Sequence, residues 1–359
     1  MSKLGPSKDK TLQKPADSPV GSGDKKEEKP IEDTILSEKI AAECLCLLGN
    51  TYLGDSYAYL KLDARERMLT NIDLIGCYQY IQFINLNNNL LNNPQLKVLA
   101  KIPCVIVLEI NENLLETTAI PKLPFLQALI MKSNRIRQVV PFDHENLGYI
   151  DLQNNQISSM DDRCFQKLPN LLKMSIGNNL LTTTAGIKCE SLVFLYLQNN
   201  RISKIHGLEH LVNLEVLNLR GNQIERLGRS SFPPSLSKLH YLNLRRNKIR
   251  RVKDFRRLKR LPSLTTLLCF ENAYDKYGDG KEVRDPILVH LKRLRRLNKT
   301  EVTAEEWDEV ERLLDSSCTD SSAPEEAAVE EDVAEEENAA DFTDDIISVV
   351  SWTLDKNTE

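Results

Sequence analysis

The chain has 359 residues, 41% of them apolar and 28% charged, and a formal net charge of −5. This composition is typical of a folded protein. The sequence has no run of about eighteen apolar residues, so we expect no membrane-spanning helix. The eight cysteines are scattered and lack the C-x-x-C spacing of a metal site, so we expect reduced structural thiols in an intracellular protein.

The first 68 residues fall into two predicted parts. Residues 1–31 are rich in Lys and Pro and lack the apolar centre of a signal peptide, which predicts a disordered arm. Residues 32–68 are predicted to form an N-terminal cap, in which YAYLKLDA alternates apolar and polar residues as an edge strand does. The preceding stretch ILSEKIAAECLCLLG predicts a helix with one apolar face, made of Leu36, Ile40, Cys44, Leu47 and Leu48.

Between residues 69 and 274 one frame recurs nine times, as in LGYIDLQNNQI, LVFLYLQNNRI and LEVLNLRGNQI. Each copy places apolar residues around a short predicted strand and ends with an asparagine, 21 to 25 residues after the previous one. The nine asparagines are Asn89, Asn113, Asn134, Asn155, Asn179, Asn200, Asn222, Asn247 and Asn272. This LxxLxLxxNxL pattern and its period are those of leucine-rich repeats.

The asparagine is the unusual member of the frame, because it lies on the inward side, where an amide is costly to bury. At the end of each strand the chain turns and leaves backbone N–H and C=O groups without partners in the sheet. An amide side chain both donates and accepts hydrogen bonds, so we predict that each asparagine pairs these groups in its own and adjacent coils.

After each asparagine, apolar residues often recur at every third position, for example at Ile202, Ile205 and Leu208. This spacing suits 3₁₀ helices and extended turns better than α-helices. The predicted fold is therefore an α/β solenoid, a leucine-rich repeat horseshoe of about nine to ten coils, with a parallel β-sheet on the concave face and short 3₁₀ or irregular turns on the convex face. Residues 275–315 are predicted to form the C-terminal cap and helix, and residues 316–359 an acidic disordered tail.

Strand residues that point away from the interior are predicted to form the concave face. Repeat solenoids commonly bind partners there, and aromatic residues are enriched at interfaces, although single exposed aromatics are also ordinary. The candidate partner-binding residues are Phe83, Tyr149, Phe194, Tyr196, Tyr241 and Phe270.

Charge is distributed unevenly along the chain. Residues 226–299 contain 21 Lys and Arg against 6 Asp and Glu, whereas residues 300–359 contain 2 against 21. The densest run, RRNKIRRVKDFRRLKR, is predicted to place its charges on the convex face as a basic patch of Arg245, Arg246, Lys248, Arg250, Arg251, Lys253, Arg256, Arg257, Lys259 and Arg260. We expect an acidic partner there, such as tubulin or the chain's own tail. Nucleic acid is disfavoured because base-stacking aromatics are not interleaved with the run.

The acidic tail is tethered beside the basic patch, so its local concentration there is high, roughly millimolar. We expect the tail to fold back over the basic coils and shield them when no partner is bound. Its last part, DFTDDIISVVSWTLDK, has apolar residues every fourth position from Phe342 to Leu354. This is typical of a short helix that folds on a partner, and an incidental apolar cluster gives the same pattern.

The sequence shows no constellation of catalytic residues. His206 and His210 form the only close histidine pair, and without further ligands they fit turn positions better than a metal site. Neither a phosphate-binding Gly loop nor a nucleophile motif appears. We therefore predict that the protein is not an enzyme and binds no cofactor or metal.

The stretch LLGNTYLGDSYAYLKLDARERMLTNIDLIGCYQYIQFINLNNNLL is more particular than the repeat consensus. It resembles the start of the leucine-rich repeat-containing protein 23 family, and the resemblance extends over about residues 36–300. The resemblance implies a structural component of the radial spokes in the axoneme of cilia and sperm flagella, a cytoskeletal location, other axonemal proteins as partners and a role in motility. Two other classes stay open: a soluble adaptor of the phosphatase-targeting type, and an RNA-processing adaptor.

Overall fold

The computed structural model describes residues 33–51, 54, 56–274 and 281–317. These residues belong to one compact unit of the chain, residues 33–359. The predicted arm, residues 1–31, lies outside the described residues. So does nearly all of the predicted tail, residues 316–359.

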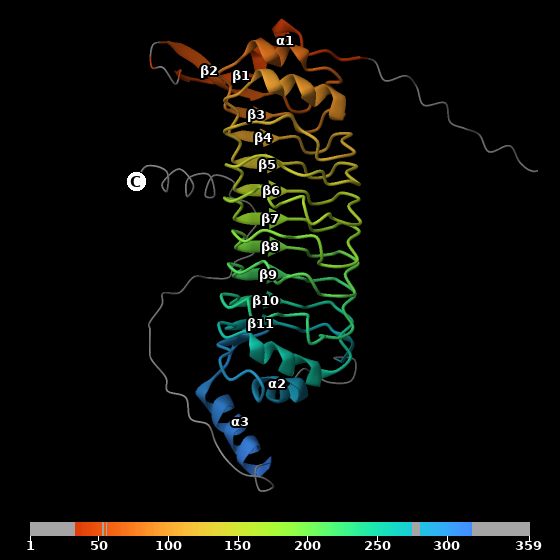
Figure 1. Ribbon diagram of the computed structural model, residues 1–359, viewed down its shortest axis with the longest axis vertical. Coiled ribbons are helices and arrows are strands. Elements are labelled where there is room, and N and C mark those ends of the chain that lie inside the picture. The colour runs from red at the N-terminus through yellow and green to blue at the C-terminus, as the bar shows by residue number, and fades with distance from the viewer. Residues whose placement is uncertain (1–32, 52–53, 55, 275–280, 318–359) are drawn as a thin grey trace, which may run out of the picture. The chain divides into compact units, whose positions relative to one another are not determined.

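One sheet of thirteen strands, arranged in sequence order, runs through the unit (Figure 1). Neighbouring strands from β2 to β12 pair in parallel, and only the first and last pairs are antiparallel. The strands are β1 (Leu45–Asn50), β2 (Tyr57–Asp63), β3 (Phe83–Asn85), β4 (Val107–Glu109), β5 (Ala128–Ile130), β6 (Tyr149–Asp151), β7 (Lys173–Ser175), β8 (Phe194–Tyr196), β9 (Val216–Asn218), β10 (Tyr241–Asn243), β11 (Thr266–Leu268), β12 (Arg296–Leu297) and β13 (Thr300–Glu301). The predicted leucine-rich repeat solenoid is confirmed.

The return segments between strands are short and contain few regular elements. Three of them form 3₁₀ helices: η1 (Asp73–Cys77), η2 (Asn93–Lys101) and η3 (Val252–Arg260). The other return segments between β3 and β11 are extended or consist of turns. A 3₁₀ helix has three residues per turn, so apolar residues spaced by three all face the interior.

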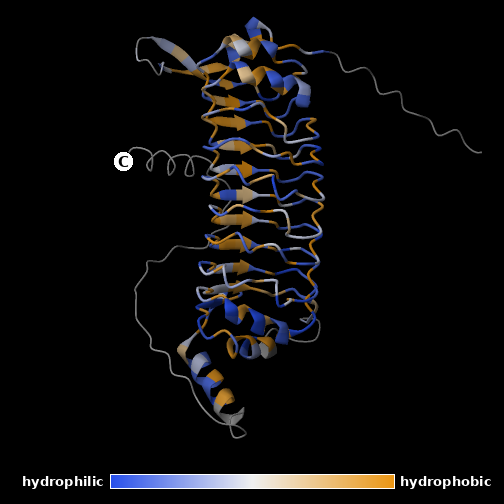
Figure 2. Cartoon of the chain, viewed as in Figure 1, coloured by the Kyte–Doolittle hydropathy of each residue, from blue (hydrophilic) through white to orange (hydrophobic). Residues whose placement is uncertain are grey.

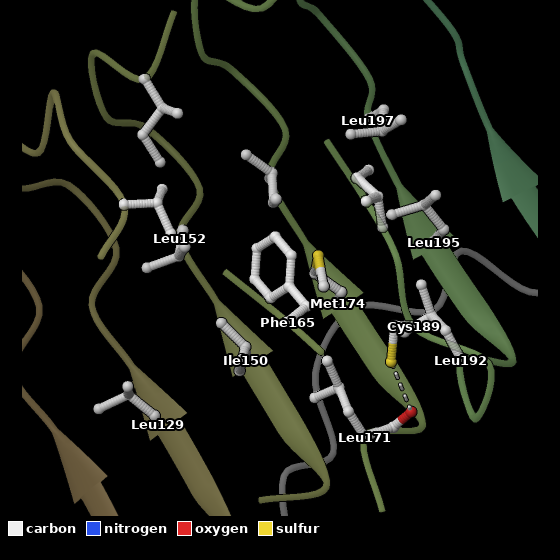
Figure 3. Close-up of a cluster of buried hydrophobic side chains, with 14 of the residues drawn as sticks. Leu129, Ile150, Leu152, Phe165, Leu171, Met174, Cys189, Leu192, Leu195 and Leu197 are labelled. Carbon is white, nitrogen blue, oxygen red and sulfur yellow. Dashed lines mark hydrogen bonds between the residues drawn. The ribbon is translucent and has the colours of Figure 1, made fainter. Parts of the chain in front are cut away.

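The core is built from the same strand position of every coil. The central residues of β5 to β8, Leu129, Ile150, Met174 and Leu195, are fully buried and stack along the solenoid (Figure 3). Figure 2 shows apolar residues along most strands of the sheet, whereas β7, with the sequence KMS, is paler. Burial of one such side chain stabilises the fold by about 1.5–3 kcal/mol. The buried apolar residues from Leu36 to Val310 form one continuous cluster, so each coil is stabilised by its neighbours.

The repeat asparagines connect adjacent coils. The Nδ2 of Asn155 donates to the carbonyl oxygens of Met131 (3.0 Å) in the preceding coil and of Leu152 (3.0 Å) in its own. Its Oδ1 accepts from the backbone N–H of Ile136 (3.1 Å). The other eight asparagines are also buried and make the same kinds of bond, a donation to the preceding coil and an acceptance at Oδ1.

Directly before each of these asparagines, one residue lies in the left-handed region of backbone conformation. The φ angle is +57° at Asn154 and +54° at both Asn178 and Asn199. The full set is Asn88, Glu112, Ser133, Asn154, Asn178, Asn199, Gly221, Arg246 and Glu271. Asparagine and glycine tolerate this conformation best, which explains the Asn-Asn doublet in four of the coils.

The N-terminal cap differs from the prediction in two respects. Helix α1 spans only Glu38–Cys44, and the chain continues as β1, so Leu47 (55% exposed) and Leu48 (62% exposed) do not lie on a buried helical face. Strand β2 alternates as expected, but it is not an edge strand, because it pairs with both β1 and β3. The spacing of the apolar residues from Leu36 to Leu48 fits a helix, but the pairing of β1 with β2 makes the second half of this stretch a strand.

The C-terminal cap contains helix α2 (Lys281–Leu288) and helix α3 (Ala304–Ser317). Leu291, Leu294 and Leu297 are buried and Val289 packs against the core, at the positions where the sequence predicts a cover for the last coil. The start of the predicted cap, residues 275–280, lies outside the described residues.

Arg284 holds the C-terminal cap together. Its Nη1 donates to the carbonyl oxygen of Leu297 (3.0 Å) and to the Oγ1 of Thr300 (2.8 Å). Its Nη2 donates to the carbonyl oxygen of Glu301 (2.8 Å) and to the carboxylate of Glu306 (2.9 Å). The hydrogen bonds from Arg284 lower the pKa of Glu306 below its ordinary value. One guanidinium therefore connects α2, the β12–β13 hairpin and α3.

Candidate interaction surface on the sheet face

The sheet face is the surface formed by strand residues whose side chains point away from the core. It has three columns that run along the solenoid. The first is Phe83, Val107, Ala128, Tyr149, Lys173, Phe194, Val216, Tyr241 and Thr266. The second is Asn85, Glu109, Ile130, Asp151, Ser175, Tyr196, Asn218, Asn243 and Leu268. The third follows the strands and includes Lys132, Gln153, Arg220, Arg245 and Phe270.

Part of this face is apolar and buried. Val107 (6% exposed), Ala128 (1%), Ile130 (1%) and Tyr149 (3%) form a hydrophobic cluster that is separate from the main core. We call these four residues the face cluster. Phe83 and Ile106 are partly buried and pack against them. Tyr149, expected to be an exposed contact residue, is therefore buried.

A fully buried carboxylate, that of Asp151, lies beside the face cluster. The Tyr149 hydroxyl donates to its Oδ2 (2.7 Å), and the backbone N–H of Gln153 donates to its Oδ1 (3.1 Å). The Lys132 ammonium lies 3.2 Å from Oδ2. A buried charge is tolerated only when it is paired and hydrogen-bonded, and Asp151 has both kinds of partner.

Lys173 separates the face cluster from the aromatic residues further along the sheet. Its ammonium lies 5.1 Å from the ring centroid of Tyr149 and 5.6 Å from that of Tyr196, both within the range of a cation–π interaction. Burial raises the pKa of the Tyr196 hydroxyl. Phe194 and Tyr241 lie nearby in the first column, and both are half-buried.

The sheet face ends near the last strands in a second cation–π arrangement. The Arg245 guanidinium lies 5.7 Å from the Phe270 ring centroid, and the Lys299 ammonium lies 5.8 Å from it. The prediction that the whole basic run lies on the convex face is therefore wrong for Arg245. The repeat frame places this residue two positions after β10, and in every coil that position belongs to the third column.

The rest of the basic patch follows the turn and the return segment. Three of its residues form ion pairs: Arg246 with Glu271, Arg250 with Glu225 (3.2 Å) and Arg251 with Asp254 (3.2 Å). In η3, four basic side chains are exposed, while Arg257 is half-buried. The exposed ones are Lys253, Arg256, Lys259 and Arg260.

Among the described cysteines, Cys44, Cys164, Cys189 and Cys269 are buried. His206 lies within hydrogen-bond distance of the Thr183 hydroxyl (3.1 Å). Within the described part of the chain, no group of three or more His, Cys, Asp or Glu is placed to hold a metal ion. Burial raises the pKa of the Cys164 and Cys189 thiols, which makes them poor nucleophiles.

Comparison with known proteins identifies the family. Residues 145–202 match the family model described as leucine rich repeat, and residues 190–234 match the model of leucine rich repeats in two copies. Leucine-rich repeat-containing protein 23 of Bos taurus is 34% identical over 280 residues, which cover 78% of this chain and 80% of the relative. The chain belongs to the leucine-rich repeat-containing protein 23 family.

Two further proteins are similar to this chain. The Homo sapiens member of the leucine-rich repeat-containing protein 23 family is 35% identical over 278 residues, which cover 77% of this chain and 79% of the relative. A solved leucine-rich repeat protein from Leptospira interrogans is 23% identical, with a TM-score of 0.43, over 67% of this chain and 72% of that chain. Family and repeats together support a protein-interaction scaffold. No helix in the described part of the chain is long and apolar enough to cross a membrane.

Sequence reasoning missed several residues of the sheet face. Lys132, Asp151 and Lys173 carry its polar contacts, yet only its aromatic residues were selected as candidates. The repeat frame already assigns all three to outward columns, so reading the charged members of each column would have found them. The exposed apolar surface of the β1–β2 hairpin was also missed, and it includes Leu48, Tyr57 and Tyr59.

Proposed function

We propose that this protein is a structural scaffold of the ciliary or flagellar axoneme, in the radial spokes, where it holds other axonemal proteins together and supports motility. The observation that carries the proposal is the alignment with leucine-rich repeat-containing protein 23 over about four-fifths of both chains. An alignment of this extent includes the solenoid as a whole rather than a few repeats, whose consensus is shared by proteins of many functions.

The structure supports a scaffold in a physical sense. Every coil is joined to the next by backbone hydrogen bonds, by the asparagine ladder and by one continuous core. A solenoid stabilised by such nearest-neighbour contacts presents its outward residues at fixed spacings. We propose that Phe194, Tyr196, Tyr241 and Phe270 contact partners on the sheet face. Aromatic residues bordered by cations are typical of protein interfaces.

We propose a separate role for the exposed cations of η3 and its flanks. They form a surface of one charge sign at the C-terminal end of the repeats, which favours an acidic partner such as tubulin or an acidic spoke protein. Ion pairs already occupy Arg246, Arg250 and Arg251, so Lys253, Arg256, Lys259 and Arg260 are the residues that we assign to this contact.

The experiment is fractionation of ciliated or flagellated cells that express the tagged protein. We expect it to remain with the detergent-insoluble microtubules and to leave them only in high salt or a chaotrope, with imaging that places it along the axoneme. Complete release by detergent alone would overturn the axonemal proposal and favour a soluble adaptor of the phosphatase-targeting type. Release by ribonuclease would favour the RNA-processing class.

A further inference from the structure

The burial of the face cluster is not explained by the strands around it. Val107 is buried, although its strand neighbours in the first column are Phe83 and Ala128. Val216 occupies the same column between the larger side chains of Phe194 and Tyr241, yet it is only half-buried. Larger neighbours should shield a valine more, so the column neighbours alone do not account for the burial of Val107, and the face cluster requires cover from beyond its own strands.

Basic residues border the face cluster and continue along the same face. Lys132 and Lys173 lie beside it, and Arg220, Arg245 and Lys299 follow toward the last strands. The acidic residues of the first two columns are Glu109 and Asp151, and Asp151 is already paired. Lys132 and Lys173 therefore place positive charge at the border of the face cluster. An apolar segment with acidic flanks fits this surface.

The chain contains such a segment. This segment is residues 341–356, DFTDDIISVVSWTLDK, which lie outside the described residues. Its suitability rests on its sequence alone. Apolar residues recur every fourth position, at Phe342, Ile346, Val350 and Leu354, with aspartates at both ends of the segment, at positions 341, 344, 345 and 355. The linker, residues 318–340, has nine Asp and Glu and neither Lys nor Arg. Its charge is complementary to the row of cations that leads to the face cluster.

The linker is long enough to bring the segment to the face cluster. Strand β5 and strand β12 are seven positions apart in the sheet, which is about 34 Å at roughly 4.8 Å per strand. Helix α3, with 14 residues, adds at most about 21 Å. The linker of 23 residues, 318–340, spans up to about 76 Å when extended. Because the two partners belong to one chain, their effective concentration is roughly millimolar.

We propose that the C-terminal segment, residues 341–356, packs its apolar residues on the face cluster of the same chain, with its aspartates toward Lys132 and Lys173. The segment then covers strands β4 to β6 and leaves the aromatic residues of β8 to β11 to other proteins. This assigns the tail a site on the sheet face, whereas the charge pattern of the sequence predicts a diffuse fold-back onto the basic coils. The inference does not depend on an axonemal role.

The test uses Trp352 in the full-length chain as the reporter. A Trp307→Phe background leaves Trp352 as the sole tryptophan of the two in the sequence. We expect its emission to be blue-shifted, and acrylamide to quench it several-fold less than in a synthetic peptide of residues 339–359. Ala128→Glu adds a charged side chain to the face cluster and should restore quenching to nearly the peptide level. Val212→Glu, an exposed position outside the three columns, is the matched control and should leave quenching unchanged.

Substitutions in the segment keep the test valid if Ala128→Glu impairs folding, because they leave the solenoid intact. Ile346→Asp combined with Val350→Asp should release Trp352 to the same extent, with an unchanged melting temperature. Equal quenching in the parent chain, in these variants and in the peptide would overturn the proposal. Analytical ultracentrifugation distinguishes a contact within one chain from a contact between two copies. If the parent chain is a dimer and these variants are monomers, the segment binds a second copy, and the proposal of an intramolecular contact is wrong.

Discussion

The side-chain amide of Asn155 donates to the carbonyl oxygen of Met131 at 3.0 Å and thereby joins two consecutive coils. The same amide serves Leu152 and Gln153 in its own coil, and its oxygen accepts from Ile136. One buried side chain therefore satisfies backbone groups that the sheet leaves open at the end of strand β6. This arrangement accounts for a polar residue in the apolar frame of every repeat.

We expect Asn155→Leu to destabilise the solenoid although it adds apolar volume to the core. Each buried backbone group left without its partner costs about 1–3 kcal/mol, and four groups contact this side chain. A fall in melting temperature of several degrees or more, measured by circular dichroism, is the expected result. Gln156→Leu is the control, because Gln156 makes no ladder bond, and it should change stability little. Equal melting of Asn155→Leu and the parent chain would refute the ladder account.

Glu112 carries a backbone strain that glycine would relieve. Its φ is +54° and its side chain is exposed, so the left-handed conformation costs about 1–2 kcal/mol there and only little at glycine. We expect Glu112→Gly to be neutral or to raise stability by up to about 1 kcal/mol in chemical denaturation. Glu116→Gly, an exposed position without positive φ, should lower it. A clear loss of stability in Glu112→Gly would contradict this reasoning.

The repeated part of the fold can be predicted well from the sequence, because the same pattern occurs nine times and each copy supports the assignment of the others. A residue such as Ile150 is assigned to the core by its register with the corresponding residues of eight other coils, and the structure places it there. The two ends have no such copies. Leu47 and Leu48 show this, since their apolar spacing fits a helix, while pairing of β1 with β2 exposes them.

The candidate site could be predicted only in part, for a different reason. The frame indicates which residues point outward, but their exposure depends on neighbours one and two coils away. Tyr149 lies between the small Ala128 and the long side chain of Lys173, and its burial does not follow from the frame alone. A continuous run of basic residues also does not show which surface each residue occupies. Arg245 and Arg256 belong to the same run, but Arg245 lies on the sheet face and Arg256 lies in the return segment.

The contact between Arg284 and Glu306 should make the C-terminal cap sensitive to acid. Since Arg284 lowers the pKa of Glu306, the contact stabilises the cap above the ordinary pKa of a glutamate, about 4.3, and the stabilisation disappears as the pH falls through the lowered value. We expect Arg284→Met to cost about 1–3 kcal/mol at pH 7. The difference from the parent chain should shrink below about pH 4.

Arg312→Met is the matched control for this prediction, because Arg312 forms an exposed pair with Glu309 in the same helix. Such a pair contributes about 0–1 kcal/mol, so the control should differ little from the parent chain at any pH. Thermal melting from pH 3 to pH 7 provides the measurement. A destabilisation by Arg284→Met that is the same at all pH values would show that packing, and not the charge of Glu306, is responsible.

The sheet face beyond the face cluster should be needed for partners more than for stability. Phe194, Tyr196 and Tyr241 point away from the core, so replacing all three by Ser should weaken capture of native partners. We expect a fall of tenfold or more in pull-downs from axonemal extract, since aromatic hot spots contribute at least about 2 kcal/mol each. The melting temperature should change only slightly. If the triple variant captures partners as well as the parent chain does, the interface lies on another surface. The exposed hairpin residues Leu48, Tyr57 and Tyr59 are the next surface to test.

The exposed cations of η3 should control binding to acidic surfaces. We expect the triple variant Lys253→Glu, Arg256→Glu and Lys259→Glu to bind taxol-stabilised microtubules several-fold more weakly than the parent chain at low salt. Because the Debye length falls from about 30 Å at 0.01 M to about 8 Å at physiological ionic strength, the difference should shrink as salt is added.

A charge-matched control separates a local contact from net charge. Arg135, Arg201 and Lys204 are exposed and lie outside the basic run, so their replacement by Glu changes the net charge equally. If both triple variants lose the same affinity, long-range attraction by the whole protein is sufficient and η3 has no special role. Loss in the η3 variant alone, with the control close to the parent chain at every salt concentration, would place the acidic partner on the C-terminal coils.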